Sequence, residues 1–211
     1  MSREEAIKAI EVGIDTVAEL KEKGYNVFAT GEMGIGNTTT SSAVCSVLLD
    51  QSVEKVTGKG AGLTNKDLEH KIEVIKQSIA LNQVDANDPI DVLSKVGGLD
   101  IAGMVGCYIG GAALQVPVFI DGFISSVAAL IAIRLVPECA PYLFPSRCSN
   151  EPAGNLILDA IGKEPYILAN MCLGEGTGAV MGFTIADYAF KAYWELPSFE
   201  QTNFGTYEEL N

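Results

Sequence analysis

The part of the sequence that most constrains the fold is residues 25–49, where the apolar segment YNVFAT, the turn GEMGIGNTTTSS and the apolar segment AVCSVLL follow one another. This order predicts a buried strand over about 25–30 and a helix over about 37–50. A second strand-like segment, VPVFIDG (116–122), precedes another predicted helix over about 123–136. Strands that alternate with helices through long crossovers predict a parallel sheet covered on both faces. We therefore expect a Rossmann-like α/β fold with glycine-rich loops at the carboxyl ends of strands, where such sheets bind ligands.

The rest of the chain gives further elements by hydrophobic spacing and end signals. Helices are expected over 3–23, 65–82, the Pro89 segment NDPIDVLSKVGG, about 152–161, and from the glycine loop LGEGTGAVMGF (173–183) to near Trp194. Residues 99–115 could be strand or helix, and the spacing of Ala102, Gly106 and Gly110 favours a tightly packed helix. PYLFPS (141–146) is a candidate third strand. We expect a single domain over 1–196 and a loosely ordered polar tail over 197–211.

The charge excludes several functions. The net charge is −13, which argues against binding to nucleic acid or to anionic membranes, since both depend on lysine and arginine. A phosphorylated ligand would have to be held locally, by backbone N–H groups and a few cations. The five cysteines contain no CxxC pair, which predicts reduced thiols in the cytoplasm. The opening residues are typical of an amphipathic helix rather than a signal peptide, and we expect no membrane span.

The first glycine loop, GEMGIGNTTTSS (31–42), fits neither common nucleotide motif. Asn37 and Thr38 stand where a P-loop has lysine and serine or threonine, and a dinucleotide fingerprint would need glycine at Thr39. Backbone N–H groups at a helix N-terminus, with Asn37, Thr38 and Thr39 as side-chain donors, could bind an anion. The alternative is a plain helix start with Asn37 as N-cap. Glu32 favours a ligand that also has a polar or cationic part.

The second glycine loop places Glu175 between glycines, where backbone can approach a ligand closely. A partly desolvated carboxylate there would have a raised pKa and could act as a general base. The alternative is an acid that pairs with the helix dipole. His70 lies beside Lys71 on a charged helix, so a solvated position is expected for it. No histidine or cysteine pair has metal-ligand spacing, no GxSxG motif indicates a serine nucleophile, and no cofactor is implied.

Four segments together carry a resemblance to a known family: GEMGIGNTTTSSAV, DVLSKVGGLDIAGMVG, VPVFIDGFISSVAAL and LGEGTGAVMG. In this order they resemble the nicotinate-nucleotide–dimethylbenzimidazole phosphoribosyltransferases of the cobalamin lower-ligand pathway. The similarity extends from the first helix to about residue 195. It implies transfer of phosphoribose from nicotinate mononucleotide to 5,6-dimethylbenzimidazole, with release of nicotinate and formation of α-ribazole 5′-phosphate.

The resemblance also implies roles for individual residues. Glu175 would be the general base that takes a proton from the benzimidazole, and Glu32 would be a second functional acid near the ribose or the base. Leu173 would pack on the aromatic acceptor. The remaining substrate-binding candidates are Gly34, Ile35, Gly36, Asn37, Thr38, Lys71, Asp121, Gly122, Ser125, Ser146, Gly174 and Gly176.

One difference from the family is large. Family members are usually longer and carry a further N-terminal segment that forms part of the wall around the acceptor base, whereas MSREEAI resembles an internal stretch of them. The sequence therefore predicts a fragment, a split gene product or a natural truncation that retains the nucleotide half of the site. A homodimer is expected, with a separate N-terminal chain as a further partner. The alternative function is a non-catalytic nucleotide-binding or assembly module that needs a partner chain for the acceptor pocket.

Overall fold

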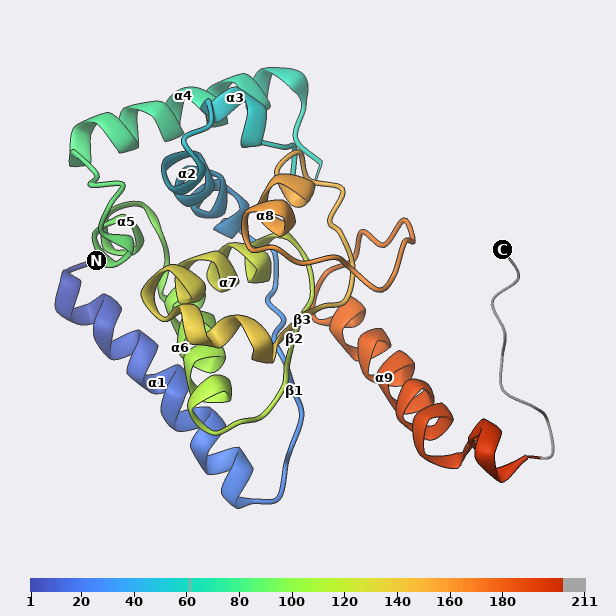
Figure 1. Cartoon of the computed structure of the whole chain (residues 1–211). Helices are drawn as coiled ribbons and strands as arrows, with labels where there is room; N and C mark the ends of the chain where they lie inside the picture. The colour runs from blue at the N-terminus through green and yellow to red at the C-terminus, as the bar shows by residue number, and fades with distance from the viewer. Residues whose placement is uncertain (61, 203–211) are drawn as a thin grey trace.

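A three-stranded parallel sheet carries the carboxyl edge on which the predicted loops lie (Figure 1). The computed structural model describes residues 1–60 and 62–202. Its strands are β1 (Phe28–Ala29), β2 (Val118–Ile120) and β3 (Leu143–Pro145), adjacent in that order. Val118 is paired with Phe28 on one side and with Leu143 on the other. The expected parallel α/β fold is confirmed, and all three strands lie within the segments predicted for them.

Helices account for most of the described chain, and each expected helix is present. The α-helices are α1 (Arg3–Glu22), α2 (Asn37–Leu49), α3 (Val53–Val56), α4 (Asn65–Asn82), α5 (Pro89–Val96), α6 (Leu99–Ala113), α7 (Phe123–Leu135), α8 (Gly154–Ala160) and α9 (Thr177–Glu195). The 3-10 helices are η1 (Pro137–Tyr142) and η2 (Phe199–Gln201). Helix α3 and both 3-10 helices were not predicted, because a segment of one or two turns shows no hydrophobic period. The tail expected over 197–211 contains η2, and 203–211 lie outside the described residues.

Different helices pack on the two faces of the sheet. The ring of Phe119 in β2 meets Phe183 of α9 edge-on, with centroids 5.1 Å apart, and Gly182 of α9 is small enough to let Phe119 lie against it. The neighbours of Phe119 in the strand, Val118 and Ile120, are fully buried with α6 and α7 in the main core. Residue alternation along one central strand therefore places α9 on one face and the helical body on the other.

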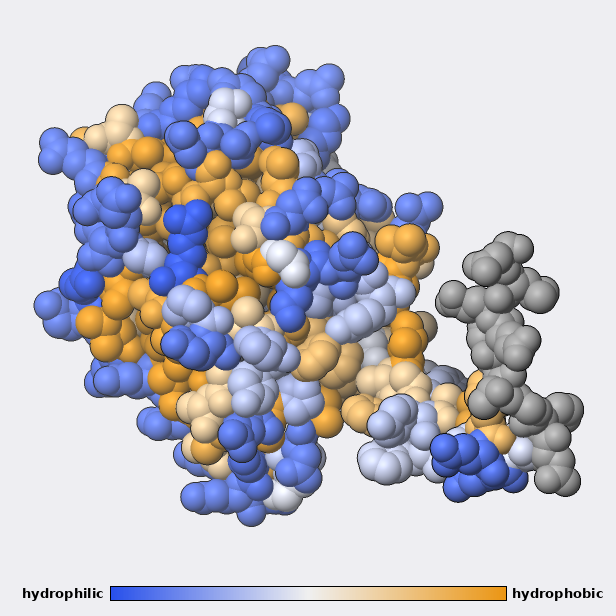
Figure 2. Space-filling model, viewed as in Figure 1, coloured by the Kyte–Doolittle hydropathy of each residue, from blue (hydrophilic) through white to orange (hydrophobic). Residues whose placement is uncertain are grey.

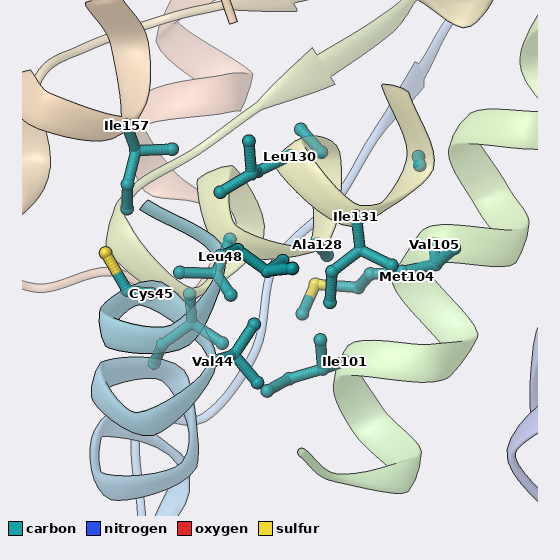
Figure 3. Packing of buried hydrophobic residues seen from close by; sticks show 14 of the residues in the cluster. Val44, Cys45, Leu48, Ile101, Met104, Val105, Ala128, Leu130, Ile131 and Ile157 are labelled. Carbon is teal, nitrogen blue, oxygen red and sulfur yellow. The ribbon is translucent and has the colours of Figure 1, made fainter. Parts of the chain in front are cut away.

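The main core lies between α2, α6, α7 and α8 (Figure 3). Figure 3 shows Val44 and Leu48 of α2 facing Ile101 and Met104 of α6 and Ile131 of α7. Helix α7 is buried from Phe123 to Ala132, which explains why its segment is apolar without a polar face. This core holds α2 and α7, whose N-termini follow β1 and β2, in fixed positions at the carboxyl edge.

Helices α1 and α6 cross with almost no side chain between their backbones. A Cβ added to Gly106 would overlap the carbonyl of Ile10, and one added to Gly110 would lie 3.1 Å from the Cα of Ile14. The small-residue spacing that favoured a packed helix over 99–115 is thus confirmed, because two of its three residues lie at this crossing. The contact fixes α1 against the body of the protein.

Helix α9 leaves the body of the protein and carries exposed aromatic side chains near its end (Figures 1 and 2). Tyr188, Phe190, Tyr193 and Trp194 are each between 64% and 76% exposed. Figure 2 shows apolar residues on its surface where it projects from the body. No helix within residues 1–60 and 62–202 is long and apolar enough to cross a membrane.

Candidate functional site

The two glycine-rich loops touch at the carboxyl edge of the sheet. A Cβ added to Gly31, which follows the last residues of β1, would lie 2.6 Å from the amide nitrogen of Gly176. Gly31 must therefore be a glycine if the two backbones are to pass this closely, whereas Gly176 needs to be a glycine because of its left-handed φ of 80°. Glu32 and Glu175 adjoin these glycines, so the contact brings the two candidate acids to neighbouring positions.

The carboxylate of Asp121 holds the second loop in place. It follows β2, is 1% exposed, and accepts hydrogen bonds from the N–H groups of Gly176 (3.1 Å) and Gly178 (2.8 Å). The Nε of Arg147, two residues after the end of β3, lies 3.4 Å from the same carboxylate. Arg147 also donates from Nη1 to the carbonyl of Met171, at 2.8 Å. This buried ion pair fixes the loop that carries Glu175 from both ends.

Several residues predicted to bind substrate are bonded inside the protein. Ser146 is fully buried and its Oγ donates to the carbonyl of Ile120 at 2.7 Å. Ser125 caps α7, accepting from the N–H of Gly122 at 2.9 Å. Gly122 leaves room for Arg147, whose Nη2 would lie 2.7 Å from a Cβ there. The structure thus places Asp121, Gly122, Ser125 and Ser146 beneath the loops, and direct contact of their side chains with substrate stays a prediction.

The backbone of the second loop is left-handed at three consecutive residues. Gly174 and Gly176 have φ values of 76° and 80°, which glycine adopts freely, while Glu175 has φ 56°. For a residue with a Cβ this conformation costs about 1 kcal/mol or more, and such strain is concentrated at functional sites. The loop therefore presents Glu175 at a cost in backbone energy.

The expected desolvation of Glu175 is not present in the described chain. Its side chain is exposed, and Leu173 beside it is 69% exposed. In the described chain the neighbouring residue Leu173 does not fold over the carboxylate, so desolvation of Glu175 stays a prediction. Leu173 and Glu175 are therefore both accessible to solvent on this strained loop.

The first loop is closed by Glu32. Its Oε2 accepts from the N–H of Gly34 at 2.5 Å and from the Nδ2 of Asn37 at 2.7 Å. The N-cap of α2 is Gly36, in the left-handed region at φ 80°, and Asn37 is the first helical residue. The alternative in which Asn37 caps the helix is therefore wrong, because its side chain is bonded to Glu32 instead. The first turn of α2 contains no acidic residue of its own, but the carboxylate of Glu32 lies beside it and already accepts from the N–H of Gly34.

Lys71 of α4 lies behind the N-terminal turn of α2. It is 7% exposed, and its Nζ donates to the Oγ1 of Thr38 and to the carbonyl of Gly58, both at 3.0 Å. Burial lowers the pKa of Lys71, while the negative charge of Glu151 acts in the opposite direction. Glu151 also accepts a hydrogen bond from the N–H of Gly60 at 3.2 Å. The structure thus joins two predicted substrate residues, Lys71 and Thr38, from distant parts of the sequence.

The sequence reasoning missed three polar residues of this region. Arg147 follows Ser146 at the carboxyl end of a strand. The expectation that ligand-binding residues lie at such ends selected Ser146 and could also have selected Arg147. Asp100 accepts from the Nδ2 of Asn37 at 2.8 Å, and only the fold reveals this contact. Tyr108 is fully buried, with its hydroxyl 2.6 Å from Thr30 Oγ1 and donating to the carbonyl of Ser125 at 3.0 Å. Within the described chain, no group of three or more His, Cys, Asp or Glu residues is arranged to hold a metal ion.

Together, the parallel sheet and the two glycine loops at its carboxyl edge define a Rossmann-like α/β protein with its candidate ligand site at that edge. Comparison with known proteins agrees with this fold class and identifies a family within it. The chain belongs to the phosphoribosyltransferase family, whose model matches residues 1–204.

Two of its relatives carry the same name. A nicotinate-nucleotide–dimethylbenzimidazole phosphoribosyltransferase of Ruminiclostridium cellulolyticum is 53% identical over 210 residues, covering 100% of this chain and 60% of the relative. One from Acetivibrio thermocellus is 52% identical over 208 residues, covering 99% and 59% respectively. The crystal structure of CobT from Thermus thermophilus matches with a TM-score of 0.91 at 30% identity, over 97% of this chain and 61% of that one. The chain thus spans about 60% of the length of the curated relatives it matches.

Proposed function

We propose that this chain transfers the phosphoribosyl group of nicotinate mononucleotide to 5,6-dimethylbenzimidazole in the assembly of the cobalamin nucleotide loop. The products are α-ribazole 5′-phosphate and nicotinate. The observation that carries the proposal is the backbone contact between Gly31 and Gly176, because it brings Glu32 and Glu175 to one place. The names of relatives about half identical to this chain support the same reaction.

The phosphate and ribose of the donor bind at the start of α2. The backbone N–H groups of residues 35–38 and the hydroxyl of Thr38 supply donors, and the helix dipole favours an anion. Lys71 supplies positive charge from behind, through its contact with Thr38. This arrangement allows a protein with a net charge of −13 to bind a phosphate locally.

Glu175 acts as the general base. One ring nitrogen of the benzimidazole attacks C1′ of the ribose with its lone pair, and the bond from C1′ to nicotinate breaks with its electron pair passing to the pyridine nitrogen. Glu175 takes the proton from the other nitrogen of the acceptor. The transition state places positive charge on C1′, which a nearby carboxylate, Glu32, stabilises.

The acceptor side of the site needs a cover that the described chain does not provide. Glu175 and Leu173 are both exposed, and the aromatic end of α9 is exposed as well. We propose that the active assembly contains a homodimer of this chain and a separate chain corresponding to the N-terminal segment of the longer relatives. A cover over Leu173 would exclude water and desolvate Glu175, which raises the basicity of a carboxylate.

The cysteine pattern supports a cytoplasmic location. The five cysteines are all unpaired in the described chain, and Cys45 and Cys139 are buried. Burial raises the pKa of Cys139 to about 11, so this thiol is inert at neutral pH. Such thiols are typical of proteins from a reducing compartment.

A second candidate function is a nucleotide-binding or assembly module without catalysis of its own. The exposure of Leu173 and Glu175 favours it, because the half of the site that would hold the acceptor is open. Both functions predict binding of nicotinate mononucleotide. They differ in whether nicotinate is released.

The test is nicotinate release from nicotinate mononucleotide with dimethylbenzimidazole, measured for the chain alone and with the N-terminal segment of the Ruminiclostridium relative added. We expect release with the segment, and a fall of about 10²-fold or more for Glu175→Gln. Glu164→Gln, which changes an exposed glutamate elsewhere, is the matched control and should leave the rate unchanged. Binding without release under both conditions would favour the module. Absence of nicotinate mononucleotide binding by calorimetry would contradict both functions.

A further inference from the structure

A fully buried tyrosine hydroxyl joins the end of β1 to the start of α7. Tyr108 of α6 has no exposed surface, and its hydroxyl lies 2.6 Å from the Oγ1 of Thr30 and donates to the carbonyl of Ser125 at 3.0 Å. Thr30 follows β1 and is 5% exposed, and Ser125 lies in the first turn of α7 and is 2% exposed. We call these three residues the tyrosine bridge.

The direction of the hydrogen bonds in the tyrosine bridge follows from the protons available. A phenol has one proton and a backbone carbonyl can only accept, so the proton of Tyr108 goes to Ser125 and the hydroxyl of Thr30 donates to the phenol oxygen. Burial raises the pKa of Tyr108, so the phenol keeps its proton at neutral pH. The phenol is therefore both a donor and an acceptor, and it connects two segments that do not follow one another in the sequence.

One end of the tyrosine bridge holds the start of the first glycine loop. Strand β1 has only two residues and lies at an edge of the described sheet, so the strand gives its own end little support. Thr30 is the next residue, and Gly31, which passes against Gly176, and Glu32 follow it. Anchoring Thr30 through its side chain therefore fixes the point from which Glu32 is presented.

The other end of the tyrosine bridge reaches the support of the second glycine loop. The Oγ of Ser125 accepts from the N–H of Gly122 at 2.9 Å and lies 3.1 Å from the carbonyl of the same residue. Asp121 directly precedes Gly122, and its buried carboxylate accepts from the N–H of Gly176 at 3.1 Å. The bridge therefore connects the start of the first loop with the turn that positions the second.

We propose that Tyr108 is a positioning residue for phosphoribosyl transfer, and that its hydroxyl sets the position of Glu32 relative to Glu175. This inference rests on the proposed function, in which Glu32 faces C1′ and Glu175 faces the attacking base. Tyr108 is fully buried and acts only through the two loops. A displacement of about 1 Å between reacting groups can lower a rate by about 10²-fold. The donor phosphate binds at α2, which the main core holds, so loss of the hydroxyl should lower kcat and change KM little.

The test is Tyr108→Phe, which removes the hydroxyl and keeps the ring in the core. Nicotinate release is measured with the N-terminal segment of the Ruminiclostridium relative present. We expect kcat to fall about tenfold, with KM for nicotinate mononucleotide changed by less than about threefold. Thr30→Val removes the shared hydrogen bond from its other side and should also lower kcat. The double variant should be no slower than Tyr108→Phe, because both substitutions remove the same bond.

Two further variants control this test. Thr30→Ser keeps a hydroxyl at the same place and should keep kcat within about threefold of the wild-type value. Ile131 is fully buried in the C-terminal half of α7, away from the carboxyl edge. Ile131→Val lowers stability by an amount similar to the loss of one buried hydrogen bond, and it should leave kcat unchanged.

Amide hydrogen exchange in the chain alone gives a readout that needs no activity. The N–H of Thr30 donates to the carbonyl of Phe119 at 3.0 Å, and the N–H of Gly122 donates to Ser125. Both amides should exchange about tenfold faster in Tyr108→Phe, because local opening becomes easier when the bridge is broken. Ile131→Val should leave their exchange unchanged.

Three results would overturn the inference: an unchanged kcat for Tyr108→Phe, an equal fall in kcat for Ile131→Val, or unchanged exchange at Thr30 and Gly122 in Tyr108→Phe. If the wild-type protein with the added segment releases no nicotinate, the proposed function fails instead. Exchange then decides the role of Tyr108 by itself, and faster exchange at the two amides would support Tyr108 as the residue that holds the two loops together.

Discussion

The substitution Asp121→Asn tests whether the buried ion pair holds the second loop. Asp121 and Arg147 have side chains only 2% and 4% exposed, and Asp121 also accepts from the N–H groups of Gly176 and Gly178. Asparagine has the same shape but only one acceptor oxygen. One of the two N–H groups would face an amide NH₂, and Arg147 would remain as a buried cation without a counter-charge, bonded to the neutral carbonyl of Met171.

The magnitude follows from these contacts. Removing one partner of a buried ion pair costs about 3–5 kcal/mol, because the charge that remains is not compensated. Each hydrogen bond to a charged acceptor contributes about 1.5–3 kcal/mol, and the effects on neighbouring groups are not additive. We therefore expect a loss of about 4 kcal/mol in the free energy of unfolding.

Urea unfolding followed by circular dichroism measures this loss. For an m-value of about 2 kcal/mol/M, the urea concentration at the unfolding midpoint should fall by about 2 M. Asp187→Asn, which removes an exposed i,i+4 pair with Lys191, should change stability by about 0.5 kcal/mol or less. The double variant Asp121→Asn/Arg147→Met should be more stable than Asp121→Asn alone, because no unpaired charge remains. This reasoning would be refuted if Asp121→Asn lowered the free energy of unfolding by less than about 1 kcal/mol. It would also be refuted if the double variant were less stable than Asp121→Asn.

Three further predictions concern other parts of the structure. Gly106→Ala should destabilise the protein by about 1–3 kcal/mol, because the new Cβ would meet the Ile10 carbonyl. Gly103→Ala on the same helix has open space at its Cβ and should stabilise the protein by up to about 1 kcal/mol. Equal urea midpoints for the two variants would contradict this. Burial lowers the pKa of Lys71 below 10.5, so the unfolded chain binds this proton more tightly than the folded protein does. The free energy of unfolding of the wild-type protein, relative to that of Lys71→Met, should therefore rise with pH up to about 10.5. A difference between the two proteins that does not change with pH would contradict this. Exposed Cys172 should react with a disulfide reagent at pH 8 in the native state, whereas Cys45, whose pKa burial raises to about 12, should react only on unfolding, which mass spectrometry of labelled peptides can check.

The elements of the fold could be predicted from the sequence because each combines a hydrophobic period with an end signal. The strand before Gly31 and the helix after Asn37 are bounded by glycines, and Asp88 and Pro89 mark the start of α5, where the Asp88 side chain accepts from Ile90 and Asp91. Helix α3 could not be predicted, since its four residues are held by packing on α2 and α4 rather than by a pattern of their own.

The candidate site was only partly predictable. Glu32 and Glu175 could be selected because an acid between glycines is unusual, and the strand-end rule selected Asp121 and Ser146. The partners of these residues could not be selected, because a contact such as that between Asn37 and Asp100 depends on how α6 lies beside α2. The exposure of Glu175 could not be predicted either, because it depends on which parts of the folded chain lie over the second loop.

The contact between Gly31 and Gly176 has a consequence for how the protein reaches its native state. The two glycines lie near opposite ends of the chain, so closing the contact requires that β1, β2 and α9 have already come together. Contacts between distant parts of a chain carry the largest loop-closure entropy and tend to form late in folding. Ligand affinity at this edge is therefore gained only when the whole described chain has folded, and recovery of binding during refolding would lag behind recovery of helix content.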